Sequence, residues 1–167
     1  GSEGQYTEKL ARIPAPFCVY RPCLRQPLQR YQPAYQVQPA PAVANGFVTF
    51  GSCNNLAKLT DRVLQAWARI LERVPTARLL IEGQGFNSEE HLTAFTERCS
   101  TAGLPLNRLE LVARENKNQY LTYHRIDIAL DPCPLTGGTT TIDLLWMGVP
   151  LVTMEGDSFR SRMGVAI

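Results

Sequence analysis

Residues 126–154 read IDIALDPCPLTGGTTTIDLLWMGVPLVTM, and this stretch has the clearest alternation of predicted strand and helix in the chain. Its apolar runs at residues 126–130 and 149–154 have the length of buried strands, and residues 140–147 between them have the pattern of a helix. Continuous apolar strands that alternate with helices are typical of parallel sheets covered by helices on both faces. We therefore interpret the stretch as a strand–helix–strand unit of an α/β domain.

The same alternation extends back along the chain. Further strands are predicted at residues 47–50, 77–81 and 109–112. Helices are predicted to begin at Thr60, at Asn87, which has Glu90 three positions later as in a capping box, and at Ser158. Right-handed crossovers then predict a Rossmann-like parallel sheet in the order 3-2-1-4-5 with flanking helices.

Residues 1–45 differ in composition from the rest of the chain. Prolines recur among Gln and Tyr residues, which excludes a regular helix or a central strand. The segment is either a flexible linker or an extended arm laid over the domain, and its aromatic residues favour partial docking: Phe17, Tyr20, Tyr31 and Tyr35. We predict an arm at residues 1–45, whose Gly1-Ser2 resembles a remnant of tag cleavage, and a Rossmann-like domain at residues 46–167.

The composition excludes several classes of function. The 167 residues carry a net charge of +2, so bulk charge indicates neither a nucleic-acid nor a membrane partner. No apolar run reaches the roughly 20 residues that cross a bilayer. The cysteines are scattered and form no CxxC pair, which argues against a disulfide framework and a zinc site and favours a cytoplasmic location: Cys18, Cys23, Cys53, Cys99 and Cys133.

The candidate site lies where the predicted strand order reverses, between the first and fourth strands, because ligands bind there in doubly wound sheets. The loops at that point are residues 51–58 and 131–141. In the second loop, Gly137 and Gly138 allow close approach of a ligand, and the threonines at 139–141 supply hydroxyl and N–H groups at a helix start. This arrangement suits a phosphate or diphosphate; a glycine turn before a capped helix is the alternative interpretation.

Other side chains extend this candidate site. Lys58 in the first loop is either a second phosphate contact or an ordinary solvated lysine. Asp143, one turn into the helix, either accepts hydrogen bonds from ribose hydroxyls or complements the helix dipole. Arg114 and Gln119 follow the third strand and are candidates for contacts with a base. The absence of Walker and GxGxxG patterns argues against ATPase and nicotinamide chemistry.

Several segments resemble the O-GlcNAc transferase family. Residues 50–59, FGSCNNLAKL, are similar to its lysine loop, residues 131–150 to its UDP-binding element, and residues 6–10, YTEKL, to the end of its first catalytic lobe. The resemblance implies the second, C-terminal lobe of a bacterial-type GT-B glycosyltransferase, truncated at its C-terminus. Such an enzyme transfers N-acetylglucosamine from UDP-GlcNAc to protein Ser or Thr with inversion and without a metal or cofactor.

The resemblance also implies roles for individual residues. Lys58 is the implied catalytic residue. The departing UDP gains negative charge in the transition state, so a cation beside it stabilises the transition state more than the ground state. The other implied UDP contacts are Asn55, Ala113, Arg114, Gln119, Gly137, Gly138, Thr139, Thr140 and Asp143. Protein acceptors would bind through tetratricopeptide repeats and a first lobe that this chain lacks, so the chain is expected to be inactive alone.

Three positions depart from animal members of the family, which have glutamine at the position of Asn55 and histidine at those of Gly138 and Gln119. The choice of base therefore stays open. Two alternatives also stay open: a non-catalytic interaction module of a tetratricopeptide-repeat protein with a degenerate nucleotide cleft, and another GT-B sugar-nucleotide enzyme. The retained Lys58 and Asp143 favour the transferase.

Overall fold

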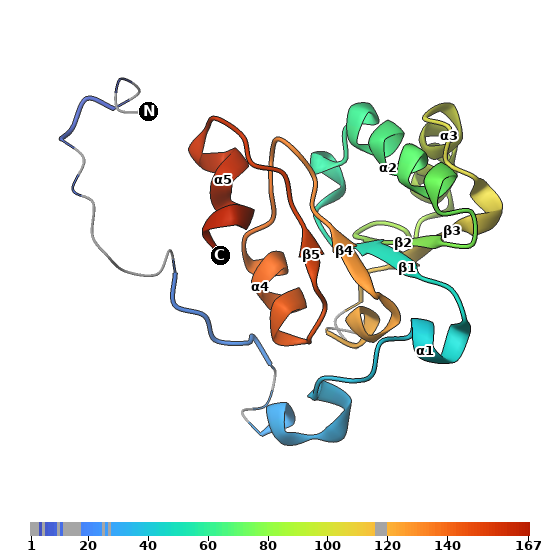
Figure 1. Cartoon of the computed structure of the whole chain (residues 1–167), viewed down its shortest axis with the longest axis horizontal. Helices are drawn as coiled ribbons and strands as arrows, with labels where there is room; N and C mark the ends of the chain where they lie inside the picture. The colour runs from blue at the N-terminus through green and yellow to red at the C-terminus, as the bar shows by residue number, and fades with distance from the viewer. Residues whose placement is uncertain are drawn as a thin grey trace.

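The computed structural model describes residues 4, 6–9, 11, 18–24, 26, 28–115 and 120–167. In this part of the chain, parallel strands form one sheet in the order β3-β2-β1-β4-β5 (Figure 1). The strands are β1 (Thr49–Ser52), β2 (Arg78–Gly83), β3 (Leu109–Ala113), β4 (Ile128–Leu130) and β5 (Leu151–Val152). The predicted order 3-2-1-4-5 is confirmed.

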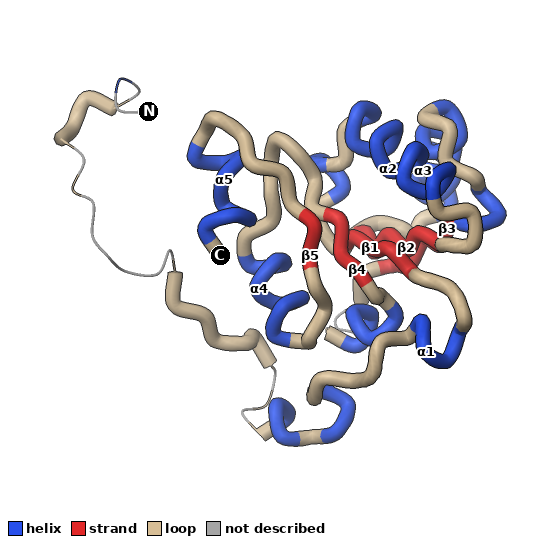
Figure 2. The backbone as a smooth tube through the Cα atoms, viewed as in Figure 1, coloured by secondary structure: helices blue, strands red, loops and turns tan. Residues whose placement is uncertain are grey.

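Helices cover both faces of the sheet and connect its strands (Figure 2). The α-helices are α1 (Ala42–Asn45), α2 (Asp61–Arg73), α3 (Glu89–Thr101), α4 (Thr139–Trp146) and α5 (Phe159–Ala166). Short 3₁₀ helices are η2 (Gln29–Tyr31), η3 (Pro33–Tyr35), η4 (Leu56–Lys58), η5 (Leu106–Arg108) and η7 (Leu121–Arg125). Among the described residues, no helix is long and apolar enough to cross a membrane.

The sheet separates two hydrophobic cores, because successive side chains of a strand point to opposite faces. Leu79 and Ile81 pack in the core formed with α2 and α3, and Leu80 between them packs in the core formed with α4 and η7. All three side chains are at most 1% exposed. Burial on both faces explains why β2 reads as a continuous apolar run rather than an alternating one.

The helix starts agree with the sequence in two cases out of three. Thr60 caps α2 and accepts a hydrogen bond from the Val63 amide at 3.4 Å, and Ser158 caps α5 in a capping box. The predicted cap at Asn87 is wrong, because Ser88 caps α3 and accepts from the His91 amide at 3.5 Å. Asn and Ser are comparable caps, so the sequence pattern did not distinguish these neighbours.

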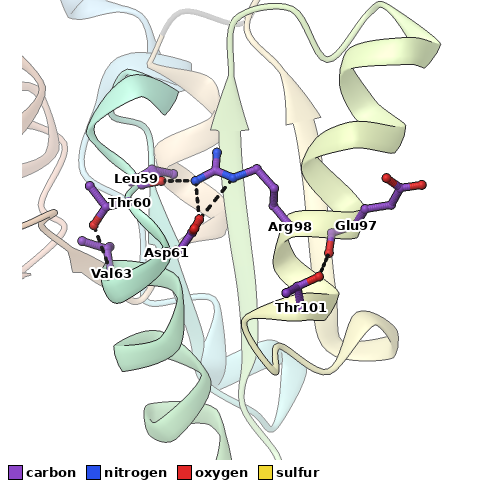
Figure 3. A network of polar contacts seen from close by, with 7 residues as sticks. All are labelled: Leu59, Thr60, Asp61, Val63, Glu97, Arg98 and Thr101. Atoms are coloured by element: carbon purple, nitrogen blue, oxygen red, sulfur yellow. Dashed lines mark hydrogen bonds and ion pairs between the residues drawn. The ribbon is translucent and has the colours of Figure 1, made fainter.

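A polar network joins α3 to the start of α2 (Figure 3). The Arg98 guanidinium donates to the Leu59 carbonyl at 2.9 Å and to the Asp61 carboxylate at 2.8 Å. Leu59 directly follows Lys58, and its side chain is 1% exposed. The network therefore fixes the carboxyl end of the loop that carries Lys58.

The described residues of the N-terminal arm contact the domain at several points. The Asp127 carboxylate accepts hydrogen bonds from the amides of Ala42 and Thr49, each at 2.8 Å. The Ala34 carbonyl lies 2.8 Å from the His124 ring nitrogen Nε2. Tyr35 packs against the core formed with α4, whereas Tyr31 is 69% exposed; Phe17 lies outside the described residues.

We predict that Asp127→Ala lowers the free energy of unfolding by about 2–3 kcal/mol, because two backbone donors lose their acceptor. Urea unfolding measures this loss, and faster hydrogen exchange at the amides of Ala42 and Thr49 would locate it. Glu72→Ala removes the same charge from an exposed site on α2 and should change stability by less than about 0.5 kcal/mol. Equal effects of the two substitutions would contradict the anchoring role of Asp127.

Candidate functional site

The site is built on two loops that leave neighbouring parallel strands at the same edge of the sheet. β1 and β4 are in register at Phe50 with Ile128, so the loops that follow them begin side by side. The Lys58 ammonium nitrogen donates a hydrogen bond to the Thr136 carbonyl at 2.9 Å. The structure therefore brings the predicted lysine to the predicted glycine–threonine loop.

Asp131 fixes the second loop from within. Its carboxylate accepts from the Gly137 amide at 2.7 Å and from the Thr153 hydroxyl at 2.8 Å, and the residue is 8% exposed. Burial raises the pKa of Asp131, against the lowering effect of these hydrogen bonds and of the Lys58 charge. Sequence reasoning missed this role, although an acid directly after a buried strand was the available signal.

Thr136 attaches the same loop to α5. Its hydroxyl donates to the Arg160 carbonyl at 2.8 Å and accepts from the Gly164 amide at 3.3 Å. Its side chain is 3% exposed. The carbonyl that receives Lys58 is therefore held on a segment with little freedom to move.

Gly137 is required by close packing. A β-carbon at this position would overlap the Thr141 hydroxyl and lie 3.0 Å from an Asp131 carboxylate oxygen and 3.2 Å from the Asn54 amide oxygen. A β-carbon at Gly138 would lie 2.8 Å from Met163 Cε, the end of a flexible side chain. The two adjacent glycines thus differ in how tightly they are enclosed.

Two buried polar side chains beneath the loop have unpaired atoms in the described part of the structure. Asn54 is 2% exposed and Thr141 is fully buried, yet neither the Asn54 amide nor the Thr141 hydroxyl has a hydrogen-bond partner there. An unpaired buried polar group costs about 1–3 kcal/mol, so native proteins keep few of them. The predicted hydroxyl of Thr141 thus lies in the core rather than at the surface of the loop, whereas sequence reasoning gave Asn54 no role of its own.

α4 offers backbone donors at its start. The helix begins at Thr139 after Gly138, and no side chain caps it. The first amides of a helix have no intrahelical acceptor and favour negative charge, so this end of α4 suits an anion. Thr139 is exposed and Thr140 half-buried, which leaves both accessible beside the Lys58 loop.

A pocket of about 160 Å³ lies between the carboxyl ends of β2 and β3 and the first turn of α4. Its lining includes Glu82, Arg114, Tyr120, Tyr123, Thr140 and Asp143. The Arg114 side chain donates to Glu82 at 2.8 Å and also to the Cys53 carbonyl, so it is held in place at the edge of the pocket. The predicted base-contacting arginine and the predicted ribose-contacting acid therefore line one cavity.

Asp143 accepts a hydrogen bond from the Tyr20 hydroxyl of the arm. Burial raises the pKa of Asp143, whereas hydrogen bonds from Tyr20 and Tyr120 lower it. The Tyr120 hydroxyl in turn accepts from the Cys23 amide at 2.8 Å. Sequence reasoning assigned no site role to Tyr20 or Tyr120.

The remaining predicted residues occupy varied positions. Asn55 is exposed, and its side-chain oxygen accepts from the Ala57 amide at 2.9 Å and so caps η4. Ala113 ends β3 next to Arg114, and Gln119 lies outside the described residues. Within the described residues, no cluster of His, Cys, Asp and Glu side chains is arranged to hold a metal ion.

Known proteins are similar to this chain in sequence. Residues 37–166 match the model of Glycosyl transferase family 41. A probable UDP-N-acetylglucosamine–peptide N-acetylglucosaminyltransferase SPINDLY of Petunia hybrida is 41% identical over 165 residues, which cover 98% of this chain and 17% of that protein. The UDP-N-acetylglucosamine–peptide N-acetylglucosaminyltransferase of Caenorhabditis elegans is 31% identical over 120 residues, or 71% of this chain and 10% of that protein.

A solved structure shares the fold. A lysine-to-methionine mutant of the Thermobaculum terrenum O-GlcNAc transferase matches with a TM-score of 0.68 and 36% identity, over 72% of this chain and 24% of that chain. The sheet and its flanking helices thus match the GT-B fold of a glycosyltransferase. The chain belongs to Glycosyl transferase family 41, which confirms the predicted resemblance, and it spans about a sixth of the length of its plant relatives.

We predict that Gly137→Ala lowers the free energy of unfolding by about 1–3 kcal/mol, because the new methyl group overlaps the buried Thr141 hydroxyl. Gly138→Ala is the matched control and should cost less than about 1 kcal/mol, since Met163 can move away. Thermal unfolding of both variants measures the difference. A Gly138→Ala loss equal to or larger than the Gly137→Ala loss would refute this account of the loop.

Proposed function

We propose that this chain is the donor-binding lobe of an inverting, metal-independent glycosyltransferase that transfers N-acetylglucosamine from UDP-GlcNAc to protein Ser or Thr. The observation that carries the proposal is the 2.9 Å contact between the Lys58 ammonium group and the Thr136 carbonyl. It sets a cation beside the uncapped start of α4. A cation and oriented N–H donors at one point are what a diphosphate requires.

The same arrangement supports a role for Lys58 in catalysis. An ammonium group has three donors, and the bond to Thr136 uses one of them. The other donors are available to the phosphate oxygens, which gain negative charge as the glycosidic bond breaks. Stabilisation that grows with this charge accelerates the reaction rather than merely tightening binding. No metal is needed for this step in the proposed mechanism.

The nucleoside is proposed to occupy the pocket between α4 and the ends of β2 and β3. Asp143 would accept hydrogen bonds from the ribose, and Ala113, Arg114 and Gln119 would lie toward the base. Gly137, Gly138, Thr139 and Thr140 would surround the diphosphate, with Asn55 at its edge. Protein acceptors would bind through repeats and a first lobe outside this chain, so the isolated lobe should show no transferase activity. We also propose a cytoplasmic location, which suits the five free cysteines.

We predict that UDP shifts the backbone amide signals of Lys58 and of residues 137–143 in an NMR titration of this chain. Uridine, which lacks the phosphates, should leave the Lys58 signal unchanged. Titrations with GDP and ADP test whether the site selects uracil. If they shift these amide signals as much as UDP does, the site does not select the base. If millimolar UDP moves none of these signals, the non-catalytic interaction module becomes the better interpretation.

We predict that Lys58→Ala in the full-length protein lowers kcat by about 100-fold or more, because removing one transition-state donor has effects of this size. The Kd for UDP-GlcNAc should rise by less than about tenfold, since the α4 amides remain. Turnover assays and equilibrium binding measure the two quantities, and Arg69→Ala on the exposed face of α2 is the control. Equal losses in kcat and in affinity would show that Lys58 contributes to binding and has no separate role in catalysis.

A further inference from the structure

A tyrosine of the arm reaches the acid that lines the pocket. Tyr20 and Asp143 are 123 positions apart in the chain, and the Tyr20 hydroxyl donates a hydrogen bond to the Asp143 carboxylate. Tyr20 is half-buried, and burial together with this hydrogen bond raises the pKa of its hydroxyl. The Tyr20 hydroxyl therefore keeps its proton near neutral pH and is a donor to the Asp143 carboxylate.

Tyr120 forms hydrogen bonds with both Tyr20 and Asp143 and so supports the same contact. It has a φ of 69°, in the left-handed region that a bulky residue rarely adopts. Its ring packs edge-on against Trp146 with centroids 5.4 Å apart, and its hydroxyl accepts from the Cys23 amide at 2.8 Å. Strain of this kind persists only where the surrounding structure imposes it. Here the contacts with Trp146 and with the Cys23 amide hold the Tyr120 side chain in place.

We propose that Tyr20 is a positioning residue that orients the Asp143 carboxylate to accept hydrogen bonds from the ribose hydroxyls of the nucleotide. This inference rests on the proposed function of the lobe. It adds to that function a residue from the arm, far from the two loops that define the site. The arm thereby becomes part of the nucleotide site.

The pocket is open in the same structure in which Tyr20 is bonded to Asp143. This favours a role in positioning the carboxylate over competition between Tyr20 and the ribose for it. Asp143, Tyr120 and Thr140 line the cavity of about 160 Å³ in the same structure that contains the hydrogen bond. A carboxylate has about four acceptor sites on its two oxygens, so the bonds from Tyr20 and Tyr120 still leave sites for two ribose hydroxyls. The Tyr20 bond also opposes the effect of burial on the Asp143 pKa and so helps to keep the acid ionised.

The test compares two ligands and three variants of this chain by calorimetry. The ligands are UDP and 2′,3′-dideoxyuridine diphosphate, which lacks both ribose hydroxyls. Tyr20→Phe should weaken UDP binding about fivefold, the effect of losing one typical hydrogen bond. It should weaken binding of the dideoxy ligand by less than about twofold. Asp143→Asn should show the same selectivity, and Tyr31→Phe, on the exposed part of the arm, should bind both ligands like the wild type.

Each other outcome has a definite meaning. Tighter UDP binding by Tyr20→Phe would show that the hydroxyl competes with ribose, and equal losses for both ligands would show a merely structural role; either overturns the inference. If the wild-type protein binds the two ligands equally, Asp143 does not contact the ribose hydroxyls and the inference is wrong, but the proposed diphosphate site is not affected. Failure of the wild type to bind UDP at all would instead overturn the proposed function.

Discussion

The hydrogen bond from Lys58 to the Thr136 carbonyl joins two loops that are 78 positions apart in the chain. The contact depends on the pairing of β1 with β4, because only adjacent parallel strands deliver their following loops to the same point. Each partner is held independently of the other. Arg98 fixes the residue after Lys58, and α5 fixes Thr136. The chemistry at this edge thus depends on the strand order of the whole sheet.

In the loop after β4, a buried polar side chain holds the backbone in a defined position. Asp131 loses hydration, and its raised pKa records that cost, but it orders the Gly137 amide and the Thr153 hydroxyl. Asn54 and Thr141 are buried nearby with unpaired atoms among the described residues. Unpaired buried polar groups weaken a core, and native proteins keep few of them. Their concentration around Gly137 distinguishes this loop from an ordinary turn.

Much of the fold and part of the site follow from local sequence patterns. The apolar runs predict every strand of the described sheet, and the handedness of crossovers predicts their order, because both rules act on the backbone. Lys58 and the glycine–threonine loop are found for the same reason: their place in the chain fixes their place at the sheet edge. Tyr20 and Tyr120 follow no such rule. Their contact with Asp143 depends on the path of the arm, which no periodicity encodes.

Asp127 has a consequence for the arm as a whole. By holding the amides of Ala42 and Thr49 with one carboxylate, it keeps the chain close to the domain just before β1. The described residues upstream of Ala42 are thereby kept near the domain, and their contacts form as intramolecular reactions at a high effective concentration. Individually weak contacts, such as Ala34 with His124 and Cys23 with Tyr120, can therefore remain occupied together.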